Sequence, residues 1–226
     1  MTQDRIRSEF NRWAESGRSR GLEKRHWDTT RQLIDLMDIE EHDNVVDLGC
    51  GVGWATRVLA QKAARGIVLG VDLSDQMIAQ ARTAYRNPPN ALFLVADASG
   101  IPCADAFFNT LLSVESIYYC PDLEAAFSEV RRILKPGGRV FFLISYYKEN
   151  TYGHEWAKHI DIPVQLLGSD DYVHILKQTG FTAAAHRRLV DSAPLPDDWT
   201  PTHWFPTREE HMKFRSEGAL LVTAEK

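Results

Sequence analysis

A glycine-rich loop followed at a distance by a carboxylate offers the first chemistry in this 226-residue sequence. The loop Gly49–Gly53 follows the apolar run Val45–Leu48, and a helical pattern begins at Trp54. Bare glycine backbone lets a ligand approach closely and presents N–H groups at the start of the following helix. Asp72 ends the next apolar run, where a carboxylate can accept both hydroxyl hydrogens of a ribose. The loop and Asp72 together predict a ligand that contains adenosine.

Three further acidic residues stand at corresponding points of the chain. Asp97 and Ala98 follow the third apolar run, and they offer a carboxylate for the exocyclic amine of adenine and an N–H for a ring nitrogen. Asp47 precedes the glycine loop, and Glu115 follows the fourth apolar run. Four carboxylates around one cleft favour a cationic ligand over a pyrophosphate. The Gly-x-Gly-x-Gly spacing also differs from the Gly-x-Gly-x-x-Gly that is typical of nicotinamide dinucleotide sites.

Strands that alternate with helices must position these residues, because apolar runs and amphipathic segments follow one another along the chain. Strands are expected at 45–48, 67–71, 92–96, 107–114, 139–146, 182–188 and 219–224, with helices beginning near Trp54, Ser74, Asp122 and Ser169. This order predicts an α/β fold with a doubly wound, mostly parallel seven-stranded sheet, preceded by two N-terminal helices. Ligands of such sheets bind at the carboxyl ends of the strands.

The chain divides into three parts of a single domain, 1–226: a helical cap over 1–40, a core that binds the cofactor over 41–146, and a C-terminal part over 147–226. In the last part, the stretch of prolines and aromatic residues at about 191–217 departs from a minimal fold. This insertion could cover an acceptor site, with the cap closing from the other side through Trp13, Arg18 and Arg20. Alternatively, its aromatic residues could only seal the edge of the sheet.

Composition and charge exclude several classes of protein. The net charge of −5 disfavours nucleic acid as a ligand, although residues 1–31 hold eight Arg and Lys against five Asp and Glu. That local excess could mark an anionic substrate or a solvated helix face. No uncharged apolar run approaches the roughly 20 residues of a membrane span, no secretory signal is recognisable, and the three scattered cysteines fit a reducing compartment. We therefore expect a cytoplasmic protein without a metal site, since the histidines lack ligand spacing.

Taken together, the motifs resemble those of class I S-adenosylmethionine-dependent methyltransferases, in the branch similar to ubiquinone and menaquinone biosynthesis enzymes. The residues that carry the resemblance are Val45–Gly53, Gly70–Ser74 with Met77, Ala96–Ala98 followed by Ile101-Pro102, and Leu134–Gly138. They occur in the family's order and spacing across roughly residues 40–145. The resemblance implies a Rossmann-like methyltransferase fold, S-adenosylmethionine as cofactor and S-adenosylhomocysteine as product.

The resemblance also implies a set of cofactor contacts. They are Asp47, Gly49, Cys50, Gly51, Asp72, Leu73, Met77, Asp97, Ala98 and Ser113. By analogy with the family, the loop would surround the methionine moiety, Asp72 would bind the ribose, and Leu73 and Met77 would lie against the adenine face. Asp97 would read the adenine edge, and Ser113 would border the sulfonium.

Methyl transfer from a sulfonium is an in-line displacement, so that alignment of the reacting atoms is the main requirement. A general base is needed only where the nucleophile must lose a proton. Glu115, Tyr118 and His154 are the candidate catalytic residues. We expect a small-molecule acceptor with a carbon, oxygen or nitrogen nucleophile. The alternatives are a catalytically silent protein that binds S-adenosylmethionine and a nicotinamide-dependent oxidoreductase. A homodimer is compatible with the sequence, which leaves the oligomeric state open.

Overall fold

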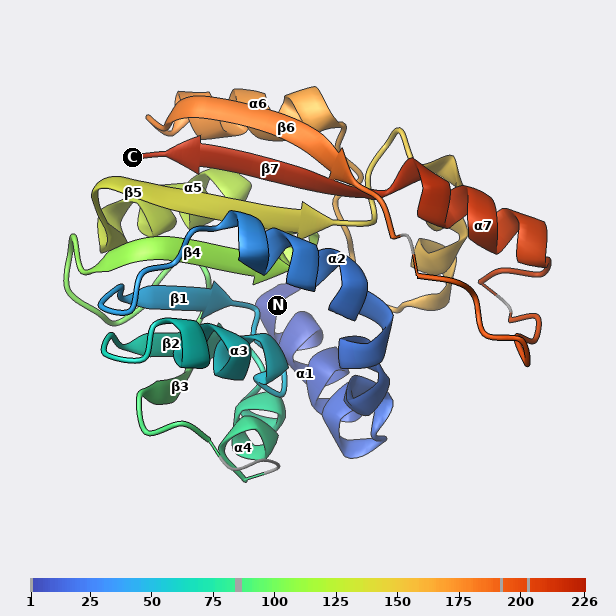
Figure 1. Ribbon diagram of the computed structural model, residues 1–226, viewed down its shortest axis with the longest axis horizontal. Coiled ribbons are helices and arrows are strands. Elements are labelled where there is room, and N and C mark those ends of the chain that lie inside the picture. The colour runs from blue at the N-terminus through green and yellow to red at the C-terminus, as the bar shows by residue number, and fades with distance from the viewer. Residues whose placement is uncertain (1, 84–86, 192, 203) are drawn as a thin grey trace.

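Seven strands form one sheet in the computed structural model, which describes residues 2–83, 87–191, 193–202 and 204–226 (Figure 1). The strands are β1 (Val45–Leu48), β2 (Val68–Asp72), β3 (Ala91–Val95), β4 (Phe108–Val114), β5 (Leu134–Ile144), β6 (Thr182–Leu189) and β7 (Ala219–Glu225). They lie in the order β3-β2-β1-β4-β5-β7-β6, and β7 is antiparallel to both β5 and β6, while the other neighbouring strands pair in parallel. The prediction of a mostly parallel seven-stranded sheet is confirmed.

Helices cover both faces of the sheet and its carboxyl edge. They are α1 (Thr2–Glu15), α2 (Leu22–Leu36), α3 (Trp54–Lys62), α4 (Asp75–Thr83), α5 (Leu123–Ile133), α6 (Ser169–Gln178) and α7 (Arg208–Glu217). The described part of the chain also holds three 3-10 helices: η1 (Arg18–Gly21) between α1 and α2, η2 (Ile117–Tyr119) before α5 and η3 (Thr151–His159) before α6. In Figure 1 the arrowheads of β1, β4 and β5 point to the right, the side where α1 and α7 lie.

Local side-chain chemistry sets the ends of several helices. The Ser74 hydroxyl accepts the Met77 N–H at 3.0 Å and caps α4, and the Asp122 carboxylate accepts the Ala125 N–H at 2.9 Å and caps α5. Both caps agree with the sequence prediction. Helix α6 instead has Gly168 at its N-cap, so that Ser169 is its first residue and not the expected cap.

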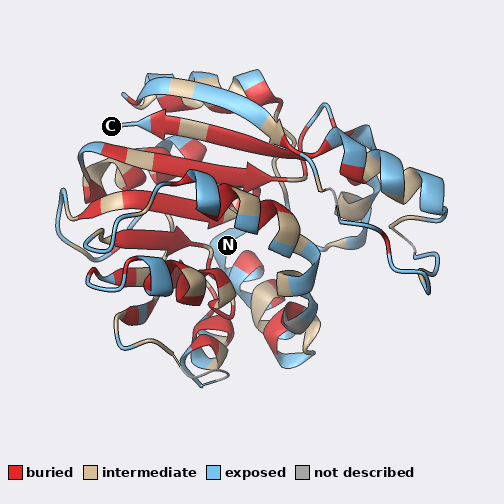
Figure 2. Ribbon diagram, in the orientation of Figure 1, coloured by how far each residue is buried: buried red, intermediate tan, exposed pale blue. Residues whose placement is uncertain are grey.

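The core has two layers, one on each face of the sheet. Successive residues of β4 point to opposite faces, so that Leu111 packs with Phe127 of α5 while Leu112 packs with Leu33 of α2 and Leu59 of α3. All five side chains are almost completely buried, and each contributes about 1.5–3 kcal/mol through loss of apolar surface to water. Figure 2 shows the central strands buried along most of their length. These two buried layers therefore fix where the carboxyl ends of the strands lie relative to one another.

The fifth strand begins five residues earlier and ends two residues earlier than the predicted range of 139–146. β5 begins at Leu134, which pairs with Phe108 of β4, and it ends at Ile144, so that Tyr146 lies beyond the strand. The sequence pattern indicated neither α7 nor η3.

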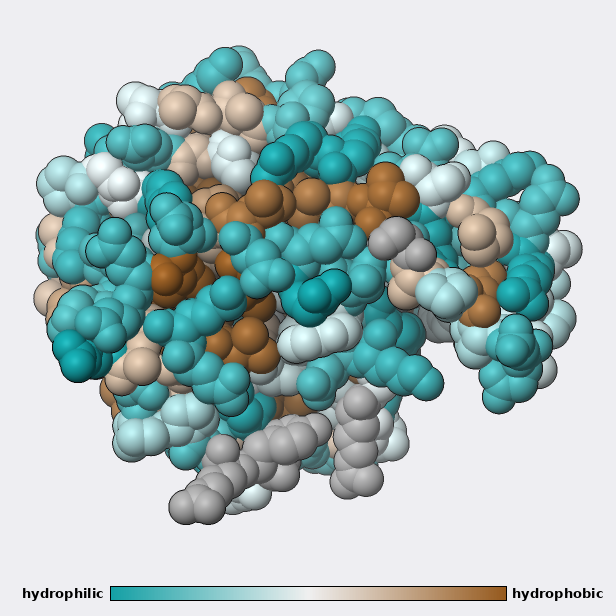
Figure 3. All heavy atoms as spheres, viewed as in Figure 1, coloured by the Kyte–Doolittle hydropathy of each residue, from teal (hydrophilic) through white to brown (hydrophobic). Residues whose placement is uncertain are grey.

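The surface is mostly hydrophilic on the face drawn in Figure 3, where hydrophobic atoms show in a band over the strands. Within the described ranges, no helix combines the length and the apolar character that a membrane crossing requires.

Candidate active site

A cavity of about 490 Å³ opens where β1, β2, β3 and β4 end. This volume lies within the range of small-molecule sites. Most of the residues that the sequence singled out line it, namely Asp47, Gly49, Cys50, Gly51, Asp72, Leu73, Met77, Asp97, Ala98, Glu115 and Tyr118. Residues up to 71 positions apart in the sequence, from 47 to 118, therefore meet at the carboxyl ends of the strands.

The glycine loop requires glycine at three positions, for different reasons. Gly49, Gly51 and Gly53 have φ angles of +75°, +52° and +78°, a region that side chains disfavour. A Cβ on Gly49 would lie 2.1 Å from the Ser116 hydroxyl, and one on Gly53 would lie 2.4 Å from the Phe93 ring. A Cβ on Gly51 would meet nothing within 4 Å. Gly51 thus leaves bare backbone beside open space, as a closely approaching ligand needs.

Asp72 joins the glycine loop to the start of α4. Its Oδ2 accepts the Gly51 N–H at 2.8 Å, and its Oδ1 accepts the Ser74 N–H at 2.8 Å. Burial raises the pKa of this carboxyl, and the two N–H groups oppose the rise. Each carboxylate oxygen has a second lone pair, so that ribose hydroxyls can still donate to it. Asp72 therefore has a structural function in addition to the ligand contact that the sequence indicated.

Asp47 is the most buried carboxylate of the cavity wall, with 2% of its surface exposed. Its Oδ2 accepts the Thr56 hydroxyl at 2.6 Å. Burial raises the pKa of Asp47 to about 7, and the neighbouring charge of Asp72 adds to the rise. Burial likewise raises the pKa of the adjacent Cys50 thiol, which stays protonated. Crowded, desolvated carboxylates favour a positively charged ligand at this end of the cavity.

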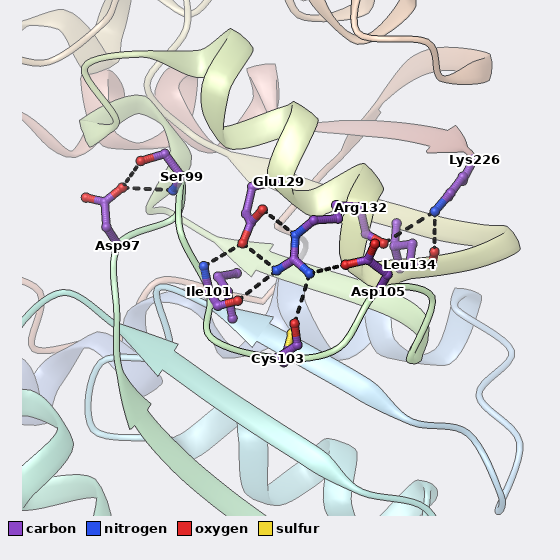
Figure 4. A network of polar contacts seen from close by, with 9 residues as sticks. All are labelled: Asp97, Ser99, Ile101, Cys103, Asp105, Glu129, Arg132, Leu134 and Lys226. Carbon is purple, nitrogen blue, oxygen red and sulfur yellow. Dashed lines mark hydrogen bonds and ion pairs between the residues drawn. The ribbon is translucent and has the colours of Figure 1, made fainter.

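Two side chains of α5 hydrogen-bond the loop after β3 (Figure 4). Asp97, which lines the cavity, lies at the start of this loop. Arg132 donates to the carbonyls of Ile101 and Cys103 at 2.8 and 2.9 Å, and Glu129 accepts the Ile101 N–H at 2.6 Å. Asp97 itself accepts the Ser99 N–H at 2.8 Å through Oδ1. No local sequence pattern indicates these contacts, because the two segments are about 30 residues apart.

Glu115 lies at the junction between the acidic and the aromatic parts of the cavity. Its φ of +52° is unusual for a residue with a side chain. Its Oε1 accepts the Ser145 hydroxyl at 2.6 Å, and its Oε2 accepts the Tyr118 hydroxyl at 3.1 Å. Burial raises the pKa of Tyr118 well above its usual range, so that the phenol keeps its proton. Glu115 and Tyr118 thus form a hydrogen-bonded pair on the cavity wall.

Aromatic rings surround this pair. The Tyr118 ring lies 4.6 Å from that of Tyr119, 5.7 Å from that of Tyr146 and 5.7 Å from that of Trp156, measured between centroids. Phe10 of α1 packs against Tyr119 at 4.7 Å. These rings present an apolar surface to an acceptor, with edges and faces that can also accommodate a cation.

Two predicted site residues lie away from the cavity wall. Ser113 is buried within β4, and its hydroxyl hydrogen-bonds the Ser116 hydroxyl at 2.7 Å. Ser116, which the sequence analysis missed, lines the cavity and donates to the Leu48 carbonyl at 2.9 Å. His154 is absent from the cavity lining, and its Nε2 donates to the Tyr147 carbonyl at 3.0 Å.

Distant segments complete the cavity. From the cap come Trp13, Arg18, Ser19, Arg25 and His26, and from the expected insertion come Thr202, Trp204, Phe205, His211 and Phe214. The insertion therefore reaches the cavity, as one of the two readings of the sequence anticipated. The side chain of Arg20 lies outside the described part of the chain. Among the residues at 2–83, 87–191, 193–202 and 204–226, no group of three or more His, Cys, Asp or Glu could hold a metal ion.

Comparisons with known proteins agree with this geometry. A family model described as "Methyltransferase domain" matches residues 46–142. A solved complex of the Haloferax volcanii Trm112 methyltransferase activator with "the putative methyltransferase" superposes with a TM-score of 0.87 at 35% identity, over 96% of this chain and 97% of that one. "Putative methyltransferase YrhH" of Bacillus subtilis is 30% identical over 53% of this chain and 69% of its own length.

Methyltransferase GfsG of Streptomyces halstedii is 34% identical over 49% of this chain and 41% of its own length. The chain spans less than two thirds of the length of the first curated relatives that it matches. The shared region contains the glycine loop, the residue at the end of β2 and the residues after β3, which are the parts that line the acidic end of the cavity.

Proposed function

The chain belongs to the class I S-adenosylmethionine-dependent methyltransferases, and on that premise we propose that it methylates a small, partly apolar acceptor molecule. One observation carries the proposal: a single cavity joins four carboxylates at the strand ends to a group of aromatic side chains. The first part suits the cationic cofactor, and the second suits an organic acceptor.

The acidic end of the cavity fits the cofactor. When bound, S-adenosylmethionine supplies a methyl group on a positively charged sulfur, already activated for displacement. The open space beside Gly51 admits a ligand close to the backbone, and the carboxylates of the buried Asp47 and the half-buried Asp72 favour its charge. Asp72 would accept the ribose hydroxyls, and Leu73 and Met77 would pack against the adenine. Asp97 and Ala98 would contact the adenine edge.

The aromatic end would align the acceptor and exclude water. The wall there consists largely of aromatic rings, those of Tyr118, Tyr119, Tyr146 and Trp156. Few polar groups are therefore available to hydrogen-bond the nucleophile of the acceptor. Positioning of this kind can supply about 7–11 kcal/mol in favourable cases. Glu115 accepts the Tyr118 hydroxyl and lines the cavity, and its carboxylate would take the proton from an acceptor that must lose one. Of the three candidate catalytic residues, we assign Glu115 and Tyr118 to the reaction, because both line the cavity and His154 does not.

Turnover with a panel of acceptors tests the proposal. The purified protein is incubated with deuteriomethyl S-adenosylmethionine and matched amines, phenols and carbon acids, and methylated products and S-adenosylhomocysteine are measured by mass spectrometry. Glu115→Gln should lower kcat about 10²-fold or more for an acceptor that loses a proton, with little change in the affinity for the cofactor. Glu124→Gln, on the exposed face of α5, is the matched control. Tight cofactor binding without any turnover would favour the catalytically silent alternative.

The complex from Haloferax volcanii also suggests a protein partner. Because that methyltransferase-like chain is similar to this one over nearly its whole length, we propose a Trm112-type activator as a candidate partner. Gel filtration of this chain mixed with the Haloferax volcanii activator tests the assignment, and separate elution of the two proteins would contradict it.

A further inference from the structure

Two arginines of the cap line the cavity without a carboxylate to neutralise them. Arg18 belongs to η1 and Arg25 to α2, and within the described chain neither forms an ion pair. The Arg18 guanidinium lies 3.7 Å from the centroid of the Trp13 ring and 5.8 Å from that of Trp204. Arg18 therefore lies between an aromatic ring of the cap and one of the insertion, on the acceptor side of the cavity.

The electrostatic surroundings compensate the charge of Arg18 only in part. Burial lowers the pKa of Arg18, and the charge of Arg25 lowers it further, while Tyr119 and Glu9 act in the opposite sense. Glu9 already accepts the Trp13 ring N–H at 2.7 Å and also pairs with Arg12. Desolvation lowers the pKa of Arg25 as well. Two guanidinium groups that repel each other and are partly removed from water favour an anion between them.

A third polar group at the same place also lacks a partner. Ser19 lines the cavity next to Arg18 in the sequence, and only 1% of its surface is exposed. Its hydroxyl has no hydrogen-bond partner among the described residues. A buried hydroxyl in this state is unfavourable unless a ligand satisfies it. The unpaired Ser19 hydroxyl is evidence that does not depend on the charges of Arg18 and Arg25, and it points to the same part of the cavity wall.

We propose that Arg18, Ser19 and Arg25 bind an anionic group of the acceptor, a carboxylate or a phosphate, while the atom to be methylated lies toward Glu115. This inference rests on the proposed function, and it narrows the acceptor to an amphipathic molecule with an anionic end. His26 also lines the cavity, and burial lowers its pKa. Planar guanidinium groups bind both oxyanions through paired N–H donors.

Binding of matched probes to the protein loaded with S-adenosylhomocysteine tests the inference. Calorimetry compares phenylacetate and phenyl phosphate with the neutral phenylacetamide, and the two anions show which oxyanion the subsite prefers. We expect at least one anion to bind about tenfold or more tightly than the amide, because one charge-assisted hydrogen bond changes Kd by about this factor. Arg18→Ala and Arg25→Ala should abolish that preference, so that the anions and the amide bind with similar affinity.

Two controls make the outcome specific. Arg31→Ala removes an exposed arginine of α2 that does not line the cavity, and it should keep the preference for the anion. Arg18→Lys, which keeps the charge, should restore part of it if Arg18→Ala perturbs the packing on Trp13. Equal affinity for anion and amide, no binding of either anion, or unchanged preference in Arg18→Ala and Arg25→Ala would overturn the inference.

The cofactor's own carboxylate is the other source of an anion, and a second arm distinguishes it. S-adenosylhomocysteine is compared with 5′-methylthioadenosine, which lacks the amino-acid part. If Arg18→Ala and Arg25→Ala weaken binding of the first but not of the second, the cofactor occupies the subsite and the assignment to the acceptor is wrong. Failure of the unmodified protein to bind S-adenosylhomocysteine at all would instead contradict the proposed function.

Discussion

Replacement of Asp72 by alanine should separate the binding of the cofactor from the folding of the chain. Asp72 lies at the end of β2, and each of its two oxygens accepts one backbone N–H at 2.8 Å. If it also accepts two ribose hydroxyls, each charged hydrogen bond contributes about 1.5–3 kcal/mol. Their loss amounts to about 3–6 kcal/mol, and therefore to about 10²–10⁴-fold in Kd.

The same substitution has a cost in stability that the sequence alone would not indicate. The N–H groups of Gly51 and Ser74 lose their acceptor, at about 1–3 kcal/mol for each one that water does not reach. We therefore expect a lower midpoint of thermal unfolding together with a folded chain at room temperature. Circular dichroism checks that the affinity is measured on folded protein.

Calorimetry with two ligands isolates the ribose contacts. The unmodified protein should bind S-adenosylhomocysteine far more tightly than the 2′,3′-dideoxy form, whereas Asp72→Ala should bind both with similar, weak affinity. Asp75→Ala is the matched control, because Asp75 is an exposed carboxylate at the start of α4 that does not line the cavity. An Asp72→Ala protein that keeps its affinity, or that still discriminates between the two ligands, would refute the ribose assignment.

Two further predictions concern the acidic end of the cavity. Asp47 has a native pKa of about 7, so the affinity for S-adenosylmethionine, measured by calorimetry, should rise with pH through that value and should be nearly independent of pH in Asp47→Asn. The carboxyl of an unfolded chain titrates near 3.8, so that between pH 3.8 and about 7 the native state holds a proton that the unfolded state has lost. The free energy of unfolding in urea should therefore fall as pH rises through that window, and it should fall less in Asp47→Asn. An affinity for S-adenosylmethionine that does not change with pH in the unmodified protein would contradict the assignment of Asp47. Gly51→Ala adds a methyl group beside open space at a φ of +52°, so it should cost about 1–2 kcal/mol of stability and weaken cofactor binding. In Gly49→Ala the new methyl group collides with Ser116, so this variant should have a lower melting temperature than Gly51→Ala. Equal melting temperatures of the two variants, or an unchanged cofactor affinity of Gly51→Ala, would argue against this account of the loop.

The order of strands and helices and the acidic end of the cavity follow from the sequence, because both depend on short-range patterns. Val45–Leu48, the glycine loop and Asp72 occur within one β-α-β unit, whose parallel strands bring their carboxyl ends together. Even so, Ser113 and Ser116 could not be distinguished from spacing alone. Their roles depend on the turn after β4, where Glu115 adopts a positive φ and Ser116 fits against the bare Gly49.

The acceptor end was decided by tertiary structure. Its wall combines cap residues such as Arg18, the Tyr118 region after β4, and insertion residues such as Trp204, which long-range packing alone brings together. No local signal tells a histidine that reaches the cavity, as His26 does, from one that donates to a nearby carbonyl, as His154 does. Side-chain partners across such distances are set by how the cap and the insertion pack on the sheet, and periodicity along the chain carries no information about that.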